Sequence, residues 1–265
     1  MGANDSERGL RRTLRKVAFA PAALFEGVGD LTILAGQVLF WAVRPPYRFA
    51  VFLDALYFVG VGSIFIVLLV GGFVGAVLAL QTVYGFARFD AEGMVGGVIG
   101  LSFTREMAPV FTALMITARA GSAMATELGT MRVTDQIDAL ATMGLSPVQY
   151  LVVPRVMACT IMAPFLCMMF NFVGILAAYG VCVWMMELDP GVFEDTVATW
   201  VDPGDVIGGL VKATVLGFFV SLIACQRGYN ARGGAAGVGT ATTQAVVHGF
   251  VVIFILDYLI TSMLL

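Results

Sequence analysis

The chain has 265 residues, of which 59% are hydrophobic and 12% are charged. Soluble domains are about 45–50% apolar and about 25% charged, so this composition excludes an ordinary soluble core. The formal net charge of −3 argues against a nucleic-acid partner. We therefore expect a single all-α, polytopic membrane domain over residues 1–265.

The N-terminal region is expected to stay on the cytoplasmic side, with a basic tail over 1–20. Residues 22–46 contain apolar runs broken by three polar residues, and arginines lie on both sides of the segment. Basic residues at both ends favour a helix that lies along the membrane interface rather than one that crosses it. Pro45 and Pro46 are expected to end this interfacial helix.

Five later stretches contain the roughly 20 mostly apolar residues that a spanning helix needs. They cover residues 57–83, 94–118, 156–186, 206–226 and 244–265. Basic residues gather before the first span and in the connections after the second and fourth spans, whereas 187–205 has acidic residues and no basic one. The positive-inside rule then places the N-terminus in the cytoplasm and the C-terminus outside.

The second span contains two adjacent charged residues, Arg105 and Glu106, about 15 Å from its start at about 1.5 Å per residue. An ionisable residue at such a depth costs about 2.5–3.5 kcal/mol and indicates a functional site by default. Pro109 lacks the amide that would bond the carbonyl of Arg105, which leaves that acceptor free beside the charges. We predict that Arg105, Glu106 and Pro109 border a substrate pocket or gate. The alternative is that each charge pairs with a partner on another helix.

Asp257 in the last span is a further candidate for this pocket or gate, although a helix–helix tether is the favoured interpretation for it. Lys212 in the fourth span is expected to extend its ammonium group outward to the membrane surface. Lys16 and Lys212 are the only lysines, and no GxxxxGK[ST] loop precedes either, so we expect no ATP hydrolysis by a P-loop in this chain. The single histidine excludes a histidine-based metal site or triad built from this chain alone. No catalytic residue, metal or cofactor is predicted.

The connection between the second and third spans, 119–155, is expected to hold a short amphipathic helix. Thr134 suits its N-cap, the helix would run to about Met143, and Gly144 suits the position after its end. Its apolar face would comprise Ile137, Leu140 and Ala141. Such a helix, held between two membrane helices, gives a soluble partner a surface to bind. The alternative is an ordinary surface helix.

Several motifs follow one another in this part of the chain. They are Arg105-Glu106-x-x-Pro109, Arg119-Ala120-Gly121-Ser122-Ala123, Glu127-x-Gly129-x-Met131-Arg132-x-Thr134-x-Gln136 and Pro154-Arg155. In this order they resemble the MlaE permease family, the membrane subunits of lipid ABC transporters that work with MCE proteins. The resemblance runs over about residues 20–265 and is densest at 101–158.

The resemblance implies a homodimer in the bacterial inner membrane, with its C-terminus in the periplasm. It implies two ABC ATPase subunits, which would bind the ATP and Mg, a hexamer of MCE-domain proteins, and in some members a STAS-domain subunit. The cargo would be a phospholipid or a related lipid. Residues 127–147 would form the coupling-helix region that rests on the ATPase. The candidate coupling residues are Glu127, Met131, Arg132, Asp135, Gln136, Asp138 and Leu140.

Two other functions fit the composition. One is a secondary transporter that uses Arg105, Glu106 and Asp257 as a proton or ion relay and needs no ATPase. The other is a membrane scaffold that binds partners but moves nothing. Neither accounts for the motifs at 119–155.

Overall fold

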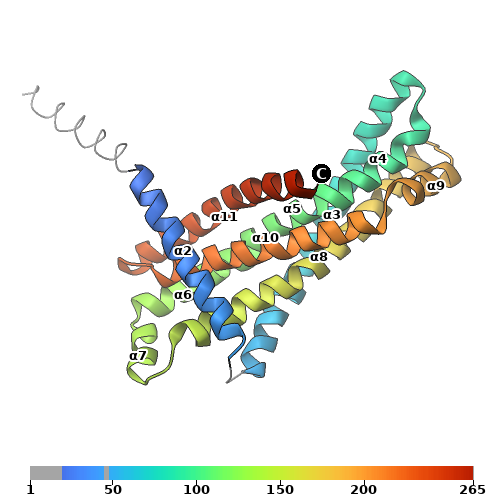
Figure 1. Cartoon of the computed structure of the whole chain (residues 1–265). Coiled ribbons are helices and arrows are strands. Elements are labelled where there is room, and N and C mark those ends of the chain that lie inside the picture. Colours follow the sequence, from blue (N-terminus) through green and yellow to red (C-terminus); the bar gives the residue numbers. More distant parts are fainter. Residues whose placement is uncertain (1–19, 45–47, 265) are drawn as a thin grey trace, which may run out of the picture.

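The structure is a computed structural model that describes residues 20–44 and 48–264. Within these residues every regular element is a helix, and five helices are long and apolar enough to cross a membrane. The five spans are Phe49–Phe89, Glu92–Val133, Val148–Met185, Pro203–Tyr229 and Gly234–Met263. The all-α fold with five spans is therefore confirmed. The spans lie side by side in one elongated bundle (Figure 1).

Two of the spans contain π-helical turns, so each consists of several helices joined end to end. The second span includes α4 (Val95–Ser102), the π-turn η3 (Phe103–Met107), α5 (Ala108–Ile116), the π-turn η4 (Thr117–Gly121) and α6 (Ser122–Val133). The third includes η5 (Val148–Val152), α8 (Val153–Gly180) and η6 (Val181–Met185). The other spans are α3 (Phe49–Phe86) with η1 (Ala87–Phe89), α10 (Pro203–Tyr229) and α11 (Gly234–Leu264).

Helices α3 and α8 pack so closely that some contacts leave no room for a side chain. A Cβ added to Gly75 would lie 2.1 Å from the carbonyl oxygen of Gly174, and one added to Gly71 would lie 3.2 Å from the ring of Phe170. Small residues at a helix contact let two backbones approach in this way. The GxxxG spacing of Gly71 and Gly75 thus reflects close packing of the first span against the third.

The two ends of the bundle differ in charge. The arginine-rich end carries Arg44, Arg48 and the connections at 134–147 and 230–233, and the acidic end carries the connections at 87–94 and 186–202. Helix α9 (Pro190–Trp200) lies at the acidic end beside α4 (Figure 1). The connection 187–205 therefore holds a helix that packs on the second span.

Helix α2 (Ala20–Ala42) occupies the place of the predicted interfacial helix. It runs obliquely across α8 and α10 in Figure 1 and contacts both of them. Val38 on its inner face is buried. The predicted helix 22–46 ends earlier than expected, at Ala42, and Pro45 and Pro46 lie outside the described residues.

The second span continues further than the sequence indicated, through Val133 instead of ending at 118. Residues 119–133 are thus helical, and the connection between the second and third long helices is 134–147; that the membrane ends near 118 stays a prediction. Four hydroxyl-bearing residues in this continuation form hydrogen bonds inside the helix. Each donates to the carbonyl four residues earlier, which keeps the helix intact. The donors are Ser122, Thr126, Thr130 and Thr134.

Candidate functional site

The π-turn η3 places the two charges of the second span. The amide of Ala108 donates to the carbonyl of Phe103, five residues back, which defines the wider turn. Single π-turns inside α-helices frequently occur at functional sites. Arg105 and Glu106 lie inside this turn, and Pro109 follows it.

Lys212 lies at the centre of a charge network that joins three spans. It is 1% exposed, and its Nζ donates to the carbonyl of Arg105 at 3.1 Å, to Oε2 of Glu106 at 2.7 Å and to Oγ1 of Thr261 at 2.7 Å. These three bonds use every proton of the ammonium group. The expectation that Lys212 extends outward to the membrane surface is therefore wrong. A carbonyl, a carboxylate and a hydroxyl inside the bundle accept hydrogen bonds from the ammonium group of Lys212 and replace the water that it would bind at the surface.

The acceptor that Pro109 leaves free is one of the three partners of this ammonium. Because proline has no amide, the carbonyl of Arg105 has no α-helical donor four residues later. Lys212 supplies the missing bond from α10. The predicted free acceptor beside the charges is thus present, and it holds a lysine in place.

Asp257 on α11 completes the inner part of the network. Its Oδ1 lies 2.9 Å from Nζ of Lys212 as an ion pair, but this atom is buried and accepts no hydrogen bond from the described residues. The ammonium has already donated its three protons elsewhere, which explains the arrangement. Thr261, one turn later on α11, donates to the backbone carbonyl of Asp257 at 2.8 Å. Through its ion pair with Lys212, Asp257 therefore connects α11 to α10.

Arg105 points to a separate partner nearer the acidic end. Its Nε lies 2.7 Å from Oδ1 of Asp205, in the first turn of α10. The other oxygen of Asp205 accepts the amide of Asp202, forming the capping box at the start of that helix. Arg105 thus contacts the group that fixes the beginning of α10.

Negative groups outnumber positive groups in this network, and two of its side chains are only partly buried. Two cations, Arg105 and Lys212, meet three carboxylates: Glu106, Asp205 and Asp257. The side chains of Arg105 and Glu106 remain 44% and 40% exposed, while that of Lys212 is 2% exposed. The pairing alternative thus describes these charges within this chain. The exposed parts of Arg105 and Glu106 are not covered by other described residues of this chain.

The candidate coupling residues of the region 127–147 lie at the arginine-rich end. Helix α7 (Gln136–Thr142) follows α6 after a two-residue turn, so the predicted helical region 127–147 is two helices rather than one. Buried Ile137 anchors α7 to the core. Arg132 pairs with Asp138 at 2.5 Å across the turn. The remaining exposed surface of α7 projects from the end of the bundle (Figure 1).

The sequence predicted the C-terminal end of α7 correctly but not its N-terminal cap. Thr134 caps the end of α6 instead of the start of α7, because its hydroxyl donates back to Thr130. Asp135 takes the N-cap position with a left-handed backbone, φ 56°. At the other end, Gly144 has φ 78° and donates to Ala141, in the arrangement of a Schellman motif. The predicted role of Gly144 is confirmed, and the N-cap role of Thr134 is wrong.

The coupling candidates are distributed over both helices. Glu127 on α6 pairs with Arg155 on α8 at 2.9 Å, which ties the second span to the third. Met131 and Leu140 are half-buried against the core. Asp135 and Gln136 are exposed. Only part of the predicted set is thus open to a partner.

Close contacts between small residues hold α6 against its neighbours. A Cβ on Gly228 of α10 would lie 2.6 Å from the carbonyl oxygen of Ala125, and one on Gly129 would lie 3.2 Å from Val238 of α11. Ala125, Ala224 and Ala245 form a small buried cluster between the same three helices. Helix α6 therefore packs without gaps on α10 and α11, which carry Lys212 and Asp257.

Known proteins resemble this chain over most of its length. The chain matches the family described as Permease MlaE over residues 52–263. It is 41% identical to a probable ABC transporter permease protein of Rickettsia bellii over 91% of this chain and 93% of the relative. A probable ABC transporter permease protein of Synechocystis is 38% identical over 97% of this chain and 95% of the relative.

A plant relative is similar over a smaller part of its own length. The Arabidopsis thaliana protein named TRIGALACTOSYLDIACYLGLYCEROL 1, chloroplastic, is 36% identical over 88% of this chain and 67% of the relative. The family match covers most of the chain, and the similarities to the bacterial permeases extend over nearly its whole length. The chain therefore belongs to the MlaE permease family, as the membrane subunit of an ABC transporter.

Proposed function

We propose that this permease moves a phospholipid or a related lipid between the inner membrane of a bacterium and MCE-domain partners in the periplasm. The observation that carries this proposal is similarity over nearly the whole chain to ABC transporter permeases, together with a relative whose name contains a diacylglycerol lipid. This membership favours the ABC permease over the ion-coupled transporter and the scaffold. ATP and Mg would be bound by two partner ATPases.

The proposed assembly is a homodimer with its arginine-rich end in the cytoplasm and its C-terminus in the periplasm. Only 11% of the most apolar stretch of α11 is buried within the chain. Such a face is available to lipid or to a second protomer. The exposed parts of Arg105 and Glu106 would then border a lipid pocket or its gate between the two protomers, with Pro109 and Asp257 in the same region.

Coupling would pass from the ATPase through α7 and α6. Asp135 and Gln136 offer polar groups at the exposed start of α7, and α6 packs tightly on α10 and α11. A displacement of α7 by the ATPase would therefore shift the helices that hold the charge network. We place the ATPase contact on the exposed surface of α7, beside the other candidates from Glu127 to Leu140.

The experiment is a gentle purification of the tagged chain from native membranes, with co-purifying proteins and lipids identified by mass spectrometry. A near-stoichiometric ATPase, an MCE-domain protein and an enriched lipid are expected, and in some organisms a STAS-domain subunit. Recovery of the chain without an ATPase in several detergents would overturn the ABC assembly and favour the ion-coupled transporter.

Matched substitutions separate the coupling surface from the lipid pocket. Asp135→Asn with Gln136→Ala should reduce recovery of the ATPase, since asparagine tolerates the left-handed backbone and only the contact changes. Asp195→Asn, on exposed α9 at the opposite end, should leave recovery unchanged. Arg105→Ala and Glu106→Ala should stop lipid movement while the complex still assembles. Unaltered lipid movement in these last two variants would support the scaffold.

A further inference from the structure

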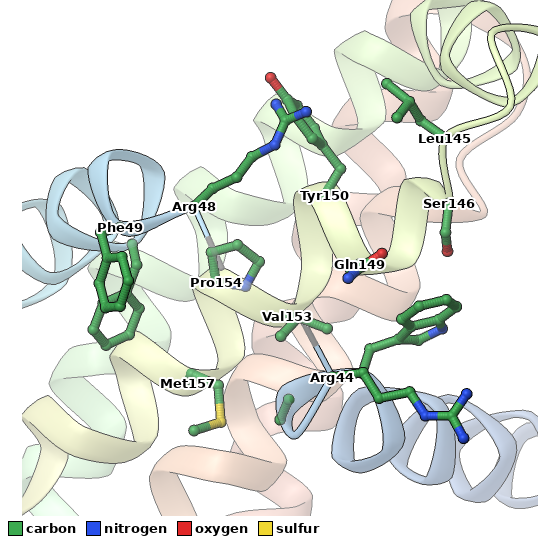
Figure 2. Close-up of a pocket in the computed structure, with 13 residues that line it drawn as sticks. Arg44, Arg48, Phe49, Leu145, Ser146, Gln149, Tyr150, Val153, Pro154 and Met157 are labelled. Carbon is green, nitrogen blue, oxygen red and sulfur yellow. The ribbon is translucent and has the colours of Figure 1, made fainter. Parts of the chain in front are cut away.

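A cavity of about 340 Å³ lies at the arginine-rich end, apart from the charge network. It is bounded by the end of α2, the start of α3 and the first turns of the third span (Figure 2). Its volume falls in the range of about 300–1,000 Å³ that is typical of small-molecule sites. Its lining includes Arg44, Arg48, Gln149, Phe52, Val153 and Met157.

Two arginines come to this cavity from different elements. The guanidinium of Arg48, just before α3, lies 4.2 Å from the ring centre of Tyr150, and that of Arg44, just after α2, lies 4.0 Å from the ring centre of Phe40. They flank the cavity on opposite sides in Figure 2. Within residues 29–44 and 48–263, neither forms an ion pair with a carboxylate. Stacking on an aromatic ring leaves the guanidinium N–H groups free to bind an anion.

The polar lining offers donors and no ionised acceptor. The Nε2 of Gln149 is buried and has no hydrogen-bond partner among the described residues. A buried donor without a partner is energetically unfavourable, so this position favours a ligand that accepts a hydrogen bond. Ser146 adds a hydroxyl group, and no acidic side chain is among the residues of the wall. The site therefore suits an anion with several acceptor oxygens.

The cavity changes from polar to apolar along the third span. Ser146 and Gln149 lie at one end, and Val153 and Met157 follow on the next turns (Figure 2). From Gln149 to Met157 is about 12 Å at about 1.5 Å per residue. Phe52 of α3 joins the apolar part. A ligand that fills this space has a charged head at the membrane interface and a hydrocarbon chain directed into the membrane.

We propose that this cavity binds an anionic glycerophospholipid from the leaflet at the arginine-rich end. The phosphodiester would accept from Gln149 within the positive field of Arg44 and Arg48, and the upper part of an acyl chain would lie against Phe52 and Met157. Each arginine near an anionic lipid surface contributes about fivefold in affinity. The inference does not require that the transported cargo be an anionic lipid, because the site lies outside the charge network. It also links the interfacial helix α2 to the first and third spans through a bound lipid.

The test uses Trp41, which lines the cavity, as a fluorescent reporter. The full chain with Trp184→Phe and Trp200→Phe is placed in nanodiscs that contain phosphatidylglycerol or phosphatidylethanolamine, brominated near the glycerol end of one acyl chain. Phosphatidylglycerol should quench Trp41 at a lower mole fraction than phosphatidylethanolamine, by roughly tenfold or more for two arginines. Arg44→Gln with Arg48→Gln should abolish this difference.

Arg88→Gln is the matched control, because Arg88 is also exposed and stacks on an aromatic ring, Tyr84, but lies at the acidic end. It should leave the preference intact. Native mass spectrometry of the chain with all three tryptophans gives a second measurement that leaves the fold unaltered. Retention of phosphatidylglycerol that falls only in the Arg44 and Arg48 variant would support the site.

Three results would overturn the proposal. Equal quenching by both lipids would show that the cavity does not select an anionic headgroup. A preference that survives the double arginine substitution would place the selectivity elsewhere. Loss of the preference on addition of millimolar inorganic phosphate would show a site for a free anion and no requirement for the acyl chain.

Discussion

Replacing Lys212 by methionine removes the one cation shared by Glu106 and Asp257. Breaking a buried ion pair by removing one partner costs about 3–5 kcal/mol, because the other charge is left uncompensated. The side chain of Glu106 is 40% exposed within the chain and that of Asp257 is 20% exposed, so we expect the lower end of this range. About 3 kcal/mol corresponds to a fall in Tm of about 6–12 °C for a domain of 150–250 residues.

The triple variant Lys212→Met, Glu106→Gln and Asp257→Asn separates the charge from the packing. Replacing all members of a buried ionic group by neutral residues of similar shape is often nearly neutral, so this variant should regain more than half of the lost stability. Scanning fluorimetry of the detergent-purified chain measures the Tm of the single and the triple variant. Arg88→Met, at an exposed position, should leave Tm within about 1 °C.

The network interpretation would be refuted by a fall of less than 2 °C in the Lys212→Met variant. It would also be refuted if the triple variant were no more stable than the single one. In the first case the ammonium group would be reaching water. In the second, the loss would come from the shape of the lysine side chain and not from its charge.

Three further predictions concern single positions. Gly75→Ala should destabilise the chain by about 1–3 kcal/mol, because its Cβ would meet the backbone of Gly174, whereas Gly72→Ala, with only Val173 at 3.6 Å, should be neutral or stabilising in the same unfolding assay. Gly144→Ala should cost about 1 kcal/mol or more, since φ is 78° there, and Gly239→Ala, which meets nothing within 4 Å, is its control in thermal unfolding. Arg105→Gln should cost no more than about 1 kcal/mol, because the Arg105 side chain is 44% exposed. A double-mutant cycle with Asp205→Asn measures that coupling, and a value above 2 kcal/mol would contradict the solvent-exposed assignment.

The sequence indicated the features that depend on local chemistry. Spans follow from the length of apolar stretches, the turn after α7 follows from Gly144, and the free acceptor at Arg105 follows from Pro109. Lys212 could not be placed in this way. Its partners lie 106 residues earlier and 45 residues later, at Glu106 and Asp257, and nothing in its own neighbourhood records them.

The end of the second span shows a different limit of the sequence. The apolar stretch ends near 118, but the helix continues to Val133, and the hydroxyl groups of its serine and threonine residues at 122–134 each donate to the carbonyl one turn earlier. Composition counts these groups as polar, while the helix uses them internally. A spacing of four between successive hydroxyls was the signal that distinguishes the two cases.

The π-turns of the second span affect how the chain can change in length. A π-turn holds one residue more than the α-helical turn it replaces, and an α-helix rotates by about 100° per residue. Deleting one residue elsewhere in the span would therefore turn every later side chain away from its present neighbour. Deleting Ala118, which is exposed within η4, would instead convert that turn to regular α-helix and leave the faces on both sides in register. The same deletion within η3 would remove the distortion that positions Arg105 and Glu106, so one π-turn can absorb a change in length and the other cannot.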